Sequence, residues 1–531
     1  MKKLLLAVLL LITSVAFAAP QYGGTLVFGK GGDASTMDPS HASDGETFIP
    51  AQQVYDNLVQ FKYGSTEIEP ALAESWSVSD DGLEYTFKLR KGVKFSKTKY
   101  FKMDSEFTSK DVVFSLKRQF DKSHPYNKVG GAYIYWSAMS MDSIVKDVIA
   151  VDKYTVKFTL KKREAPFIAN LAMEFAMILS SDYADALAKK GKQAELSKKP
   201  VGTGPFIFKS WRKDDKIVYT ANKNYWNGRP YIDKLILKVI TNNSVRAAEL
   251  KAGSIHIMDA PNPAEVASLE ANPKIKLVKQ EGLNVGYLAF NQEKKIFKDK
   301  RVRQAISYAI NTKAIVKSIY EGLGKVATNP IPPTMWSYNK ALKGYAYNPE
   351  KAKKLLAEAG YPNGFETNIW AMPVARPYNP NGRKVAEAMQ ADLAKVGIKV
   401  KIVSYDWSTY LQKSSMGEHD MVLLGWTGDN GDPDNFLNVL LSAHAAEHKP
   451  AENRAFWKNA EFTKLIDDAK TITDVAERTK LYEKAQIIFE EEAPWKTIAH
   501  SIVVEPMLTK VHGFKLDPVG KRRFKEVWLA K

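Results

Sequence analysis

Residues 425–436 form the segment of this sequence whose composition is most suited to binding a charged ligand. The segment holds three aspartates, of which Asp429 is the first, and it follows an apolar stretch predicted to be a strand over residues 421–424. Its glycines allow backbone conformations that other residues avoid, so such a segment can hold carboxylates at the mouth of a cleft. A calcium loop would need a glycine at its sixth position, where Asn435 stands. A plain turn is the remaining alternative.

A second candidate segment, residues 370–381, contains a single arginine among aromatic residues and prolines. Arg376 is followed directly by Pro377, which restricts the local chain. A guanidinium in such a setting suits the recognition of a carboxylate through two parallel hydrogen bonds. Stacking on Tyr378 or a surface ion pair is the alternative, and composition alone does not separate the three.

The sequence gives weak support for catalysis. His444, Glu447 and His448 match the H-x-x-E-H order of one class of zinc hydrolases. That site requires a continuous helix, whereas Pro450 follows within two residues, so we interpret the segment as a solvated loop or helix end. The chain has no cysteine and no nucleophile elbow, and residues 202–206 lack the ending of a phosphate loop. We expect no catalytic residues, no metal and no cofactor, with an exported zinc hydrolase as the alternative.

The amino terminus predicts export. Lys2 and Lys3 precede an apolar stretch over residues 4–15, and the small-x-small pattern at residues 16–18 is typical of a cleavage site. The apolar stretch is shorter than the roughly 20 residues that a membrane span needs. We predict a signal peptide over residues 1–19 and, because no cysteine follows it, a periplasmic protein that is not a lipoprotein.

The charge and length of the chain narrow the class of protein. The 531 residues carry a formal net charge of +18, but the lysines are spread over the whole length and alternate with acidic residues, as in residues 351–358. No basic arm or aromatic nucleic-acid motif occurs, so we predict no nucleic-acid partner. A chain of this length can bury a core without disulfides, and it corresponds to roughly two to four domains.

The predicted elements are a mixture of helices and strands. Strands are expected at residues 24–30, 83–90 and 154–160, the last two from their alternation of apolar and polar side chains. Thr108 and Asp111 are spaced as in a capped helix start.

The second half of the chain predicts further helices and two buried strands. A helix is expected from Asn348, its N-cap, to Gly360, and one helical stretch over residues 302–320. Two apolar segments far apart in sequence, residues 282–291 and 498–505, are predicted as buried strands.

Several motifs together resemble a known family. The stretches that carry the resemblance are residues 70–76, 85–92, 202–206, 284–287, 302–305 and 331–336, with the arginine and aspartate segments described above. Over essentially the whole chain after the leader, they resemble the extracytoplasmic solute-binding proteins of the peptide/nickel class (family 5), which serve ABC importers, and within that class its dipeptide-binding members.

The resemblance implies an α/β, two-lobed periplasmic-binding-protein fold of the Venus-flytrap type, with an extra domain inserted in the first lobe and two hinge strands. The implied boundaries are residues 20–283 for lobe I, about 55–190 for its inserted domain, 284–500 for lobe II and 501–531 for the return to lobe I. The hinges would lie near Asn284 and Ser501.

The resemblance also implies residue roles. Arg376 would hold the α-carboxylate of a dipeptide and Asp429 its α-ammonium, with Trp407 and Tyr378 as aromatics beside the ligand. Further site residues by the same resemblance are Ser43, Asp44, Gly45, Trp426, Thr427 and Gly428. Fixing both poles sets the ligand's length, because one more extended residue adds about 3.3 Å.

The resemblance implies partners as well: a dipeptide ligand and an inner-membrane ABC permease complex, with a chemoreceptor or haem as further candidates, for a monomeric protein. Two segments, residues 31–47 and 442–453, depart from the dipeptide-binding pattern, so the preference for ligand side chains is expected to differ. Haem, glutathione and longer peptides remain alternative ligands.

Overall fold

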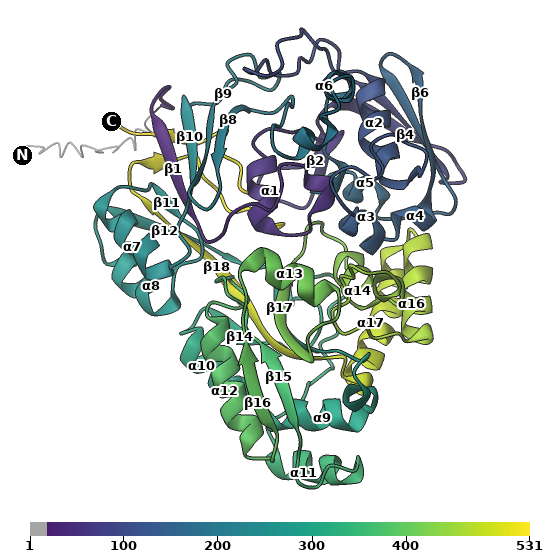
Figure 1. The fold of residues 1–531 in the computed structure, drawn as a ribbon, viewed down its shortest axis with the longest axis vertical. Helices are drawn as coiled ribbons and strands as arrows, with labels where there is room; N and C mark the ends of the chain where they lie inside the picture. Colours follow the sequence, from purple (N-terminus) through teal and green to yellow (C-terminus); the bar gives the residue numbers. More distant parts are fainter. Residues whose placement is uncertain (1–18) are drawn as a thin grey trace, which may run out of the picture.

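The computed structural model describes residues 19–531, and Figure 1 shows their arrangement. Residues 1–18, and with them nearly all of the predicted leader, lie outside the described residues. The fold is mixed α/β, in agreement with the sequence. Within residues 19–531, no helix is long and apolar enough to cross a membrane.

One mixed sheet of 12 strands runs through the described part of the chain. Its order is β16 (Lys399–Val403), β15 (Glu366–Trp370), β17 (Met421–Thr427), β13 (Asn284–Phe290), β18 (Trp495–Leu508), β11 (Ile257–Met258), β1 (Thr25–Lys30), β10 (Lys234–Val239), β9 (Lys216–Ala221) and β8 (Phe206–Arg212). Two further strands, β12 (Ile275–Glu281) and β14 (Gly324–Val326), pair with β18. We call the side from β16 to β13 the β17 end of the sheet and the side from β11 to β8 the β1 end.

The long strand β18 joins these two ends. Its residues 502–508 pair with β12, whereas residues 495–501 pair with β13 and β14. Every residue of β13 is buried. Asn284 and Ser501 contact each other directly, since Oδ1 of Asn284 accepts hydrogen bonds from the backbone N–H of Ser501 at 2.9 Å and from its hydroxyl at 3.1 Å. The two apolar segments predicted as strands therefore lie side by side where β18 passes between the two ends.

Helices cover the β17 end and enclose a separate core. They are α9 (Lys300–Ala309), α10 (Thr312–Ile319), α11 (Pro349–Glu358) and α12 (Gly382–Ala394), all in the lower part of Figure 1. The helix predicted from Asn348 is confirmed as α11, with the Asn348 side chain accepting from the backbone N–H of Lys351 and Gly360 at a φ of 91°. The single helical stretch predicted over residues 302–320 is wrong: it is two helices, because Ile310 is extended and Asn311 caps a new helix.

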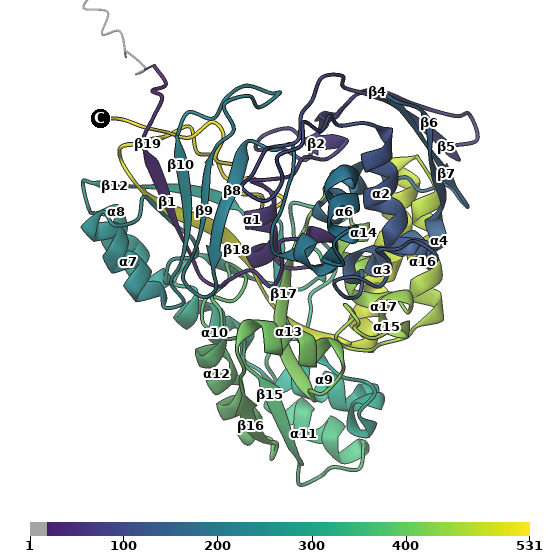
Figure 2. The same cartoon turned by 45° about the horizontal axis from the view of Figure 1, so that its top comes forward.

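A smaller sheet of four strands lies beside the β1 end. Its order is β4 (Ala73–Val78), β5 (Glu84–Leu89), β7 (Thr155–Leu160) and β6 (Val145–Asp152), and α2 (Ser109–Phe120) packs on it. Figure 2 shows these strands at the edge of the molecule with α2 inside them. The predicted helix start is confirmed, since Thr108 and Asp111 form a reciprocal capping box.

A group of C-terminal helices packs between this four-stranded sheet and the β17 end. The helices are α14 (Asp434–Leu441), α15 (His444–Glu447), α16 (Ala460–Thr471) and α17 (Val475–Glu492). Two contacts tie them and the preceding loop to residues near the four-stranded sheet: Asn430 donates to Asn170 at 3.0 Å, and the backbone N–H of Ala165 donates to the carbonyl of Lys470 at 2.7 Å. The chain after β18 then returns to the β1 end (Figure 1).

Candidate functional site

Three neighbouring parallel strands bring the main candidate residues to one edge of the sheet. β15 pairs in parallel with both β16 and β17. Arg376 lies in the loop after β15, Trp407 begins α13 (Trp407–Ser415) after β16, and Asp429 follows β17. The carboxyl ends of parallel strands meet at one edge, where open α/β sheets commonly bind ligands. Arg376 and Asp429, 53 positions apart in sequence, therefore gather with Trp407 because of the strand order.

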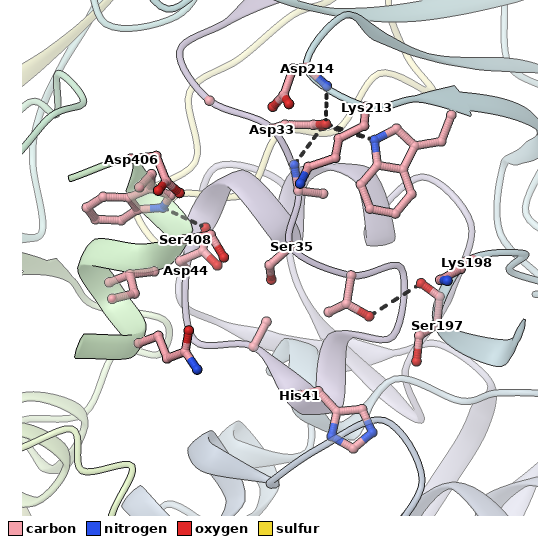
Figure 3. A pocket seen from close by; sticks show the side chains of 18 of the residues that line it. Asp33, Ser35, His41, Asp44, Ser197, Lys198, Lys213, Asp214, Asp406 and Ser408 are labelled. Atoms are coloured by element: carbon pink, nitrogen blue, oxygen red, sulfur yellow. Dashed lines mark hydrogen bonds between the residues drawn. The ribbon is translucent and has the colours of Figure 1, made fainter. Parts of the chain in front are cut away.

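Two adjoining cavities lie between this edge and α1 (Gly45–Ala51). The inner cavity, of about 140 Å³, is lined from one side by the start of α1 and from the other by residues of β17 and the loop after β15. The outer cavity, of about 1350 Å³, extends from it toward Asp33 and Lys198 (Figure 3). The residues that line both cavities are Ser43, Asp44, Trp407, Leu411, Glu452 and Arg454.

At one end of the inner cavity, Arg376 is held by a carboxylate and an aromatic ring. Its Nη1 donates to Oε1 of Glu46 at 2.8 Å, and its guanidinium lies 5.0 Å from the centre of the Trp407 ring. Glu46 is also 3.1 Å from Nζ of Lys30. Burial opposes the charge of Arg376, but the carboxylate of Glu46 outweighs it and raises the pKa of the guanidinium. Nη2 of Arg376 is buried and has no hydrogen-bond partner within residues 19–531.

Asp429 at the other end of the cavity has no cation beside it. Its carboxylate accepts a hydrogen bond from the hydroxyl of Tyr135, and its backbone N–H donates to Asn435 at 2.8 Å. Burial raises the pKa of Asp429 well above 3.8, and the negative charge of Glu174 adds to the effect. The hydrogen bond from Tyr135 opposes this shift, and so does the ammonium of Lys521. That ammonium is itself paired with Glu174 at 2.7 Å. Asp429 is therefore a half-buried acid that lacks a counter-charge.

The segment before α1 contacts the residues of the β17 end. Asp44 caps α1 by accepting from the backbone N–H of Thr47, and it also accepts from Nε1 of Trp407 at 3.3 Å. Ser43 donates to Oε1 of Glu452 at 2.5 Å. Gly45 directly follows Asp44 in the sequence and lines the inner cavity. These contacts join a segment near the start of the chain to elements hundreds of residues later.

Tyr378 occupies space that two glycines leave open. A Cβ atom at Gly286 would collide with the backbone of Tyr378, and one at Gly425 would collide with its ring. The Tyr378 carbonyl accepts from the hydroxyl of Tyr320 at 2.6 Å, which fixes the loop that carries Arg376. Glycine at these two strand positions is thus what allows the aromatic ring to lie on the sheet.

The structure brings together nine of the ten predicted site residues. Those that line the inner cavity are Ser43, Asp44, Gly45, Arg376, Tyr378, Trp407, Trp426, Thr427 and Asp429. Gly428 does not line it: this residue packs against Phe436 and Leu283, and its backbone N–H donates to the carbonyl of Leu283. A Cβ atom at this position would collide with the side chains of Phe436 and Leu283, so glycine allows this close packing next to Asp429.

Four residues at the site were missed by the sequence-based prediction: Tyr135, Glu46, Glu452 and Arg454. Tyr135 comes from the short helix α3 (Ile134–Ala138), next to the smaller sheet, and nothing in the sequence relates it to Asp429. Glu46 could have been noticed, because it directly follows the predicted segment at residues 43–45. The other two follow Pro450 in a polar segment whose position only the fold reveals.

The zinc-hydrolase pattern does not form a site. His444 is paired with Asp467 at 2.9 Å through Nε2, and His448 is exposed just beyond the one-turn helix α15. Neither histidine lines the two cavities described above. Among residues 19–531, no group of three or more His, Cys, Asp or Glu side chains is arranged to hold a metal ion.

Comparisons with known proteins match nearly the whole chain. Residues 67–447 match the family "Bacterial extracellular solute-binding proteins, family 5 Middle". The chain is 48% identical over 490 residues to heme-binding protein A of Haemophilus influenzae, which covers 92% of this chain and 89% of that protein. It is 46% identical over 518 residues to the dipeptide-binding protein of Escherichia coli, which covers 97% of this chain and 96% of that protein.

A solved structure is similar over the same extent. It is the ABC transporter-associated periplasmic binding protein DppA from Helicobacter pylori in complex with the peptide STSA. The TM-score is 0.93 at 48% sequence identity, and the match covers 96% of this chain and 99% of that chain. The fold and the edge of the sheet described above are thus shared with a protein whose ligand is a short peptide.

Proposed function

Because the chain belongs to the family 5 bacterial extracellular solute-binding proteins, we propose that it binds dipeptides between Arg376 and Asp429 and delivers them to an ABC importer. The family binds solutes and does not transform them, so the protein is a binding protein and not an enzyme. The proposed place of action is the periplasm, the proposed partner is an inner-membrane permease complex, and the proposed state is a monomer.

The observation that carries the proposal is that the ionisable groups at the two ends of the inner cavity are each incompletely paired. Asp429 is a half-buried acid with a hydroxyl but no cation beside it. Arg376 is a guanidinium only 11% exposed, and its buried Nη2 is unpaired. A buried charge without a partner is heavily penalised, and charge-assisted hydrogen bonds are the strong ones. A zwitterion with its ammonium at Asp429 and its carboxylate at Arg376 would complete both.

Binding would change the state of the two ends in different ways. The raised pKa of Asp429 favours the protonated acid when the cavity holds no cation. A ligand ammonium stabilises the carboxylate, so binding would release a proton from Asp429. Arg376 is already charged and paired with Glu46, so the ligand carboxylate would use its unpaired Nη2 and share the guanidinium.

We also propose that the protein is a two-lobed Venus flytrap with an inserted domain, and that it is closed in this structure. With the boundaries at residues 283/284 and 500/501, four site contacts join opposite lobes: Ser43 to Glu452, Asp44 to Trp407, Glu46 to Arg376 and Tyr135 to Asp429. Opening at Asn284 and Ser501 would break all four at once and admit the ligand.

A second candidate ligand is haem, and one relative and one cavity favour it. Heme-binding protein A is as similar to this chain as the peptide-binding relatives. The outer cavity of about 1350 Å³ is also far larger than a dipeptide needs. The STSA peptide of the similar solved structure favours peptides longer than two residues as well. Glutathione is the remaining alternative, and all of these ligands use the same cleft.

Calorimetric titration of mature protein, unfolded and refolded to remove bound ligand, would test the proposal. The ligands are Ala-Phe, N-acetyl-Ala-Phe, Ala-Ala-Phe and free Phe, with haem followed by its absorbance. We expect tight binding of Ala-Phe and at least about 30-fold weaker binding of the acetylated peptide, which lacks the ammonium. Equal binding of the two would contradict the role of Asp429. Binding of haem alone would replace the dipeptide proposal.

A further inference from the structure

Arg454 is a buried arginine at the junction of the two cavities, directly after the segment in which the sequence departs from the dipeptide-binding pattern. Its side chain is 4% exposed, and it lines both the inner and the outer cavity. The backbone carbonyl of Arg454 is hydrogen-bonded to Nε2 of His419 at 2.9 Å, which fixes the chain at this point. Any part of a ligand that extends from the inner cavity into the outer one would pass this side chain.

The guanidinium of Arg454 has few partners of its own. Oε2 of Glu452 lies 3.4 Å from Nη2. Nε and Nη1 are buried and have no hydrogen-bond acceptor within residues 19–531. Guanidinium groups carry five N–H donors, and buried donors in folded proteins are nearly always paired. The missing acceptors are therefore expected to come from what the cavity binds.

Glu452 does not satisfy Arg454, because it is shared. Its other oxygen, Oε1, accepts from the hydroxyl of Ser43 at 2.5 Å, across the proposed lobe interface. Glu452 thus links the segment before α1 to Arg454 when the structure is closed. The unpaired edges of the guanidinium remain available to the cavities.

The wall of the outer cavity carries lysines, and most of them have no ion-pair partner. The lysines on it are Lys99, Lys198, Lys199, Lys209 and Lys213. Of these, only Lys199 forms an ion pair in the described part of the chain, with Glu195 at 2.8 Å. In contrast, Asp33 on the same wall accepts from Nε1 of Trp211 and from the backbone N–H of Asp214 (Figure 3). The carboxylate of Asp33 is thus engaged, whereas most of the ammonium groups on this wall are not.

From these contacts we propose that Arg454 is a second carboxylate-binding residue, and that the protein favours short peptides with a carboxylate besides the one held by Arg376. This inference rests on the proposed function. The carboxylate has two sources: an acidic side chain of a dipeptide, or the α-carboxylate of a peptide too long to end at Arg376. Both place the same chemical group at the junction of the cavities.

A carboxylate fits these observations better than a peptide carbonyl does. A carboxylate supplies a counter-charge as well as hydrogen-bond acceptors, whereas a carbonyl supplies acceptors alone, so a buried guanidinium with unpaired donors gains most from an anion. The lysines of the outer cavity would attract the same anion. A carbonyl would leave that part of the wall without a role.

The test compares matched pairs of ligands in wild type and in Arg454→Gln. The dipeptide pairs are Ala-Glu with Ala-Gln and Glu-Ala with Gln-Ala, and the tripeptide pair is Ala-Ala-Ala with its C-terminal amide. We expect wild type to prefer the acidic member of at least one pair by about tenfold, the contribution of one charge-assisted bond. Arg454→Gln should abolish that preference by weakening the acidic member of the pair toward the affinity of its neutral counterpart. Preference within a dipeptide pair identifies the side chain as the source, and preference within the tripeptide pair identifies the α-carboxylate.

Two controls keep the outcome decisive. Lys209→Gln, on the exposed wall of the outer cavity, should retain most of the preference, and Arg454→Lys should retain part of it if Arg454→Gln does not fold. Equal affinities within all three wild-type pairs, or a preference that survives Arg454→Gln, would overturn the inference. Failure of wild type to bind Ala-Phe would instead remove the proposed function, so the two failures are distinguishable.

Discussion

At the two ends of the inner cavity, the protein surrounds groups of opposite charge with different kinds of partner. At the Arg376 end the protein supplies its own counter-charge, because Glu46 lies between Arg376 and Lys30. At the Asp429 end it supplies a hydroxyl and no cation. One end is therefore charged and paired before a ligand arrives, whereas at the other end burial raises the pKa of the acid.

This difference indicates where a ligand gains most. An ammonium at Asp429 meets an acid that has no cation beside it within residues 19–531, so the charge interaction is made by the ligand alone. A carboxylate at Arg376 must share its guanidinium with Glu46. We therefore expect loss of the Asp429 end to harm binding more, and loss of the Arg376 end to harm folding more.

The largest expected effect is that of Asp429→Asn on affinity. Removing one partner of a buried charge pair costs about 2–5 kcal/mol, so Ala-Phe should bind roughly 100-fold more weakly or worse. Stability should change little, because the amide resembles the protonated acid that the raised pKa of Asp429 favours without ligand. Calorimetry and thermal unfolding of the ligand-free variant measure the two effects. A large drop in melting temperature would mean that Asp429 is ionised and paired in the free protein.

Arg376→Gln should reverse this balance. The ligand loses an anchor, and we expect roughly tenfold weaker binding of Ala-Phe, since the guanidinium was already shared. Glu46 would remain buried with Lys30 alone, and breaking a buried pair in this way costs up to about 3–5 kcal/mol of unfolding free energy. Denaturant unfolding of the ligand-free variant gives the stability. Arg376→Lys, which keeps a cation beside Glu46, is the matched control, and it should retain much of the stability that Arg376→Gln loses.

If instead Arg376→Gln weakened binding far more than Asp429→Asn did, the comparison between the two ends would be reversed. The carboxylate anchor would then dominate, and Glu46 would have to move away from Arg376 on binding.

The sequence predicted most of the local structure around the site and little of its electrostatics. The strand before Asp429 and the cap of α11 follow from composition and spacing, and both are present. The break at Asn311 was missed, because apolar spacing continues through it and only the cap geometry separates the two helices.

The partners of the anchors lay beyond sequence reasoning for a physical reason. Asp429 and Tyr135 are 294 positions apart, and Arg376 and Glu46 are 330 apart. Such contacts depend on how α3 and the start of α1 pack against the β17 end, which no local pattern encodes. Arg454 was missed for the same reason, and its segment carries no motif of its own.

The smallest expected effect is the pH dependence of binding, and it sharpens the comparison because only one end titrates. Where Asp429 is enclosed as in this structure and has no cation beside it, burial raises its pKa above the ordinary value of 3.8. Between pH 3.8 and the raised pKa, the Asp429 carboxyl of the free protein holds a proton that the complex releases. Affinity for Ala-Phe should therefore rise with pH there, by at most about tenfold per pH unit.

The same shift sets the sign of the stability change. Because the folded chain binds this proton more tightly than the unfolded chain does, the contribution of Asp429 to stability is present below pH 3.8 and is lost as the pH rises through its raised folded value. Titrations should stay below about pH 7, so that the ligand ammonium, with a pKa of about 7.7–8.0, remains protonated. Calorimetry in two buffers of different ionisation enthalpy counts the released proton. Arg376→Gln should keep the slope and Asp429→Asn should lose it; a slope that persists in Asp429→Asn would assign the proton to another group and leave Asp429 ionised at all times.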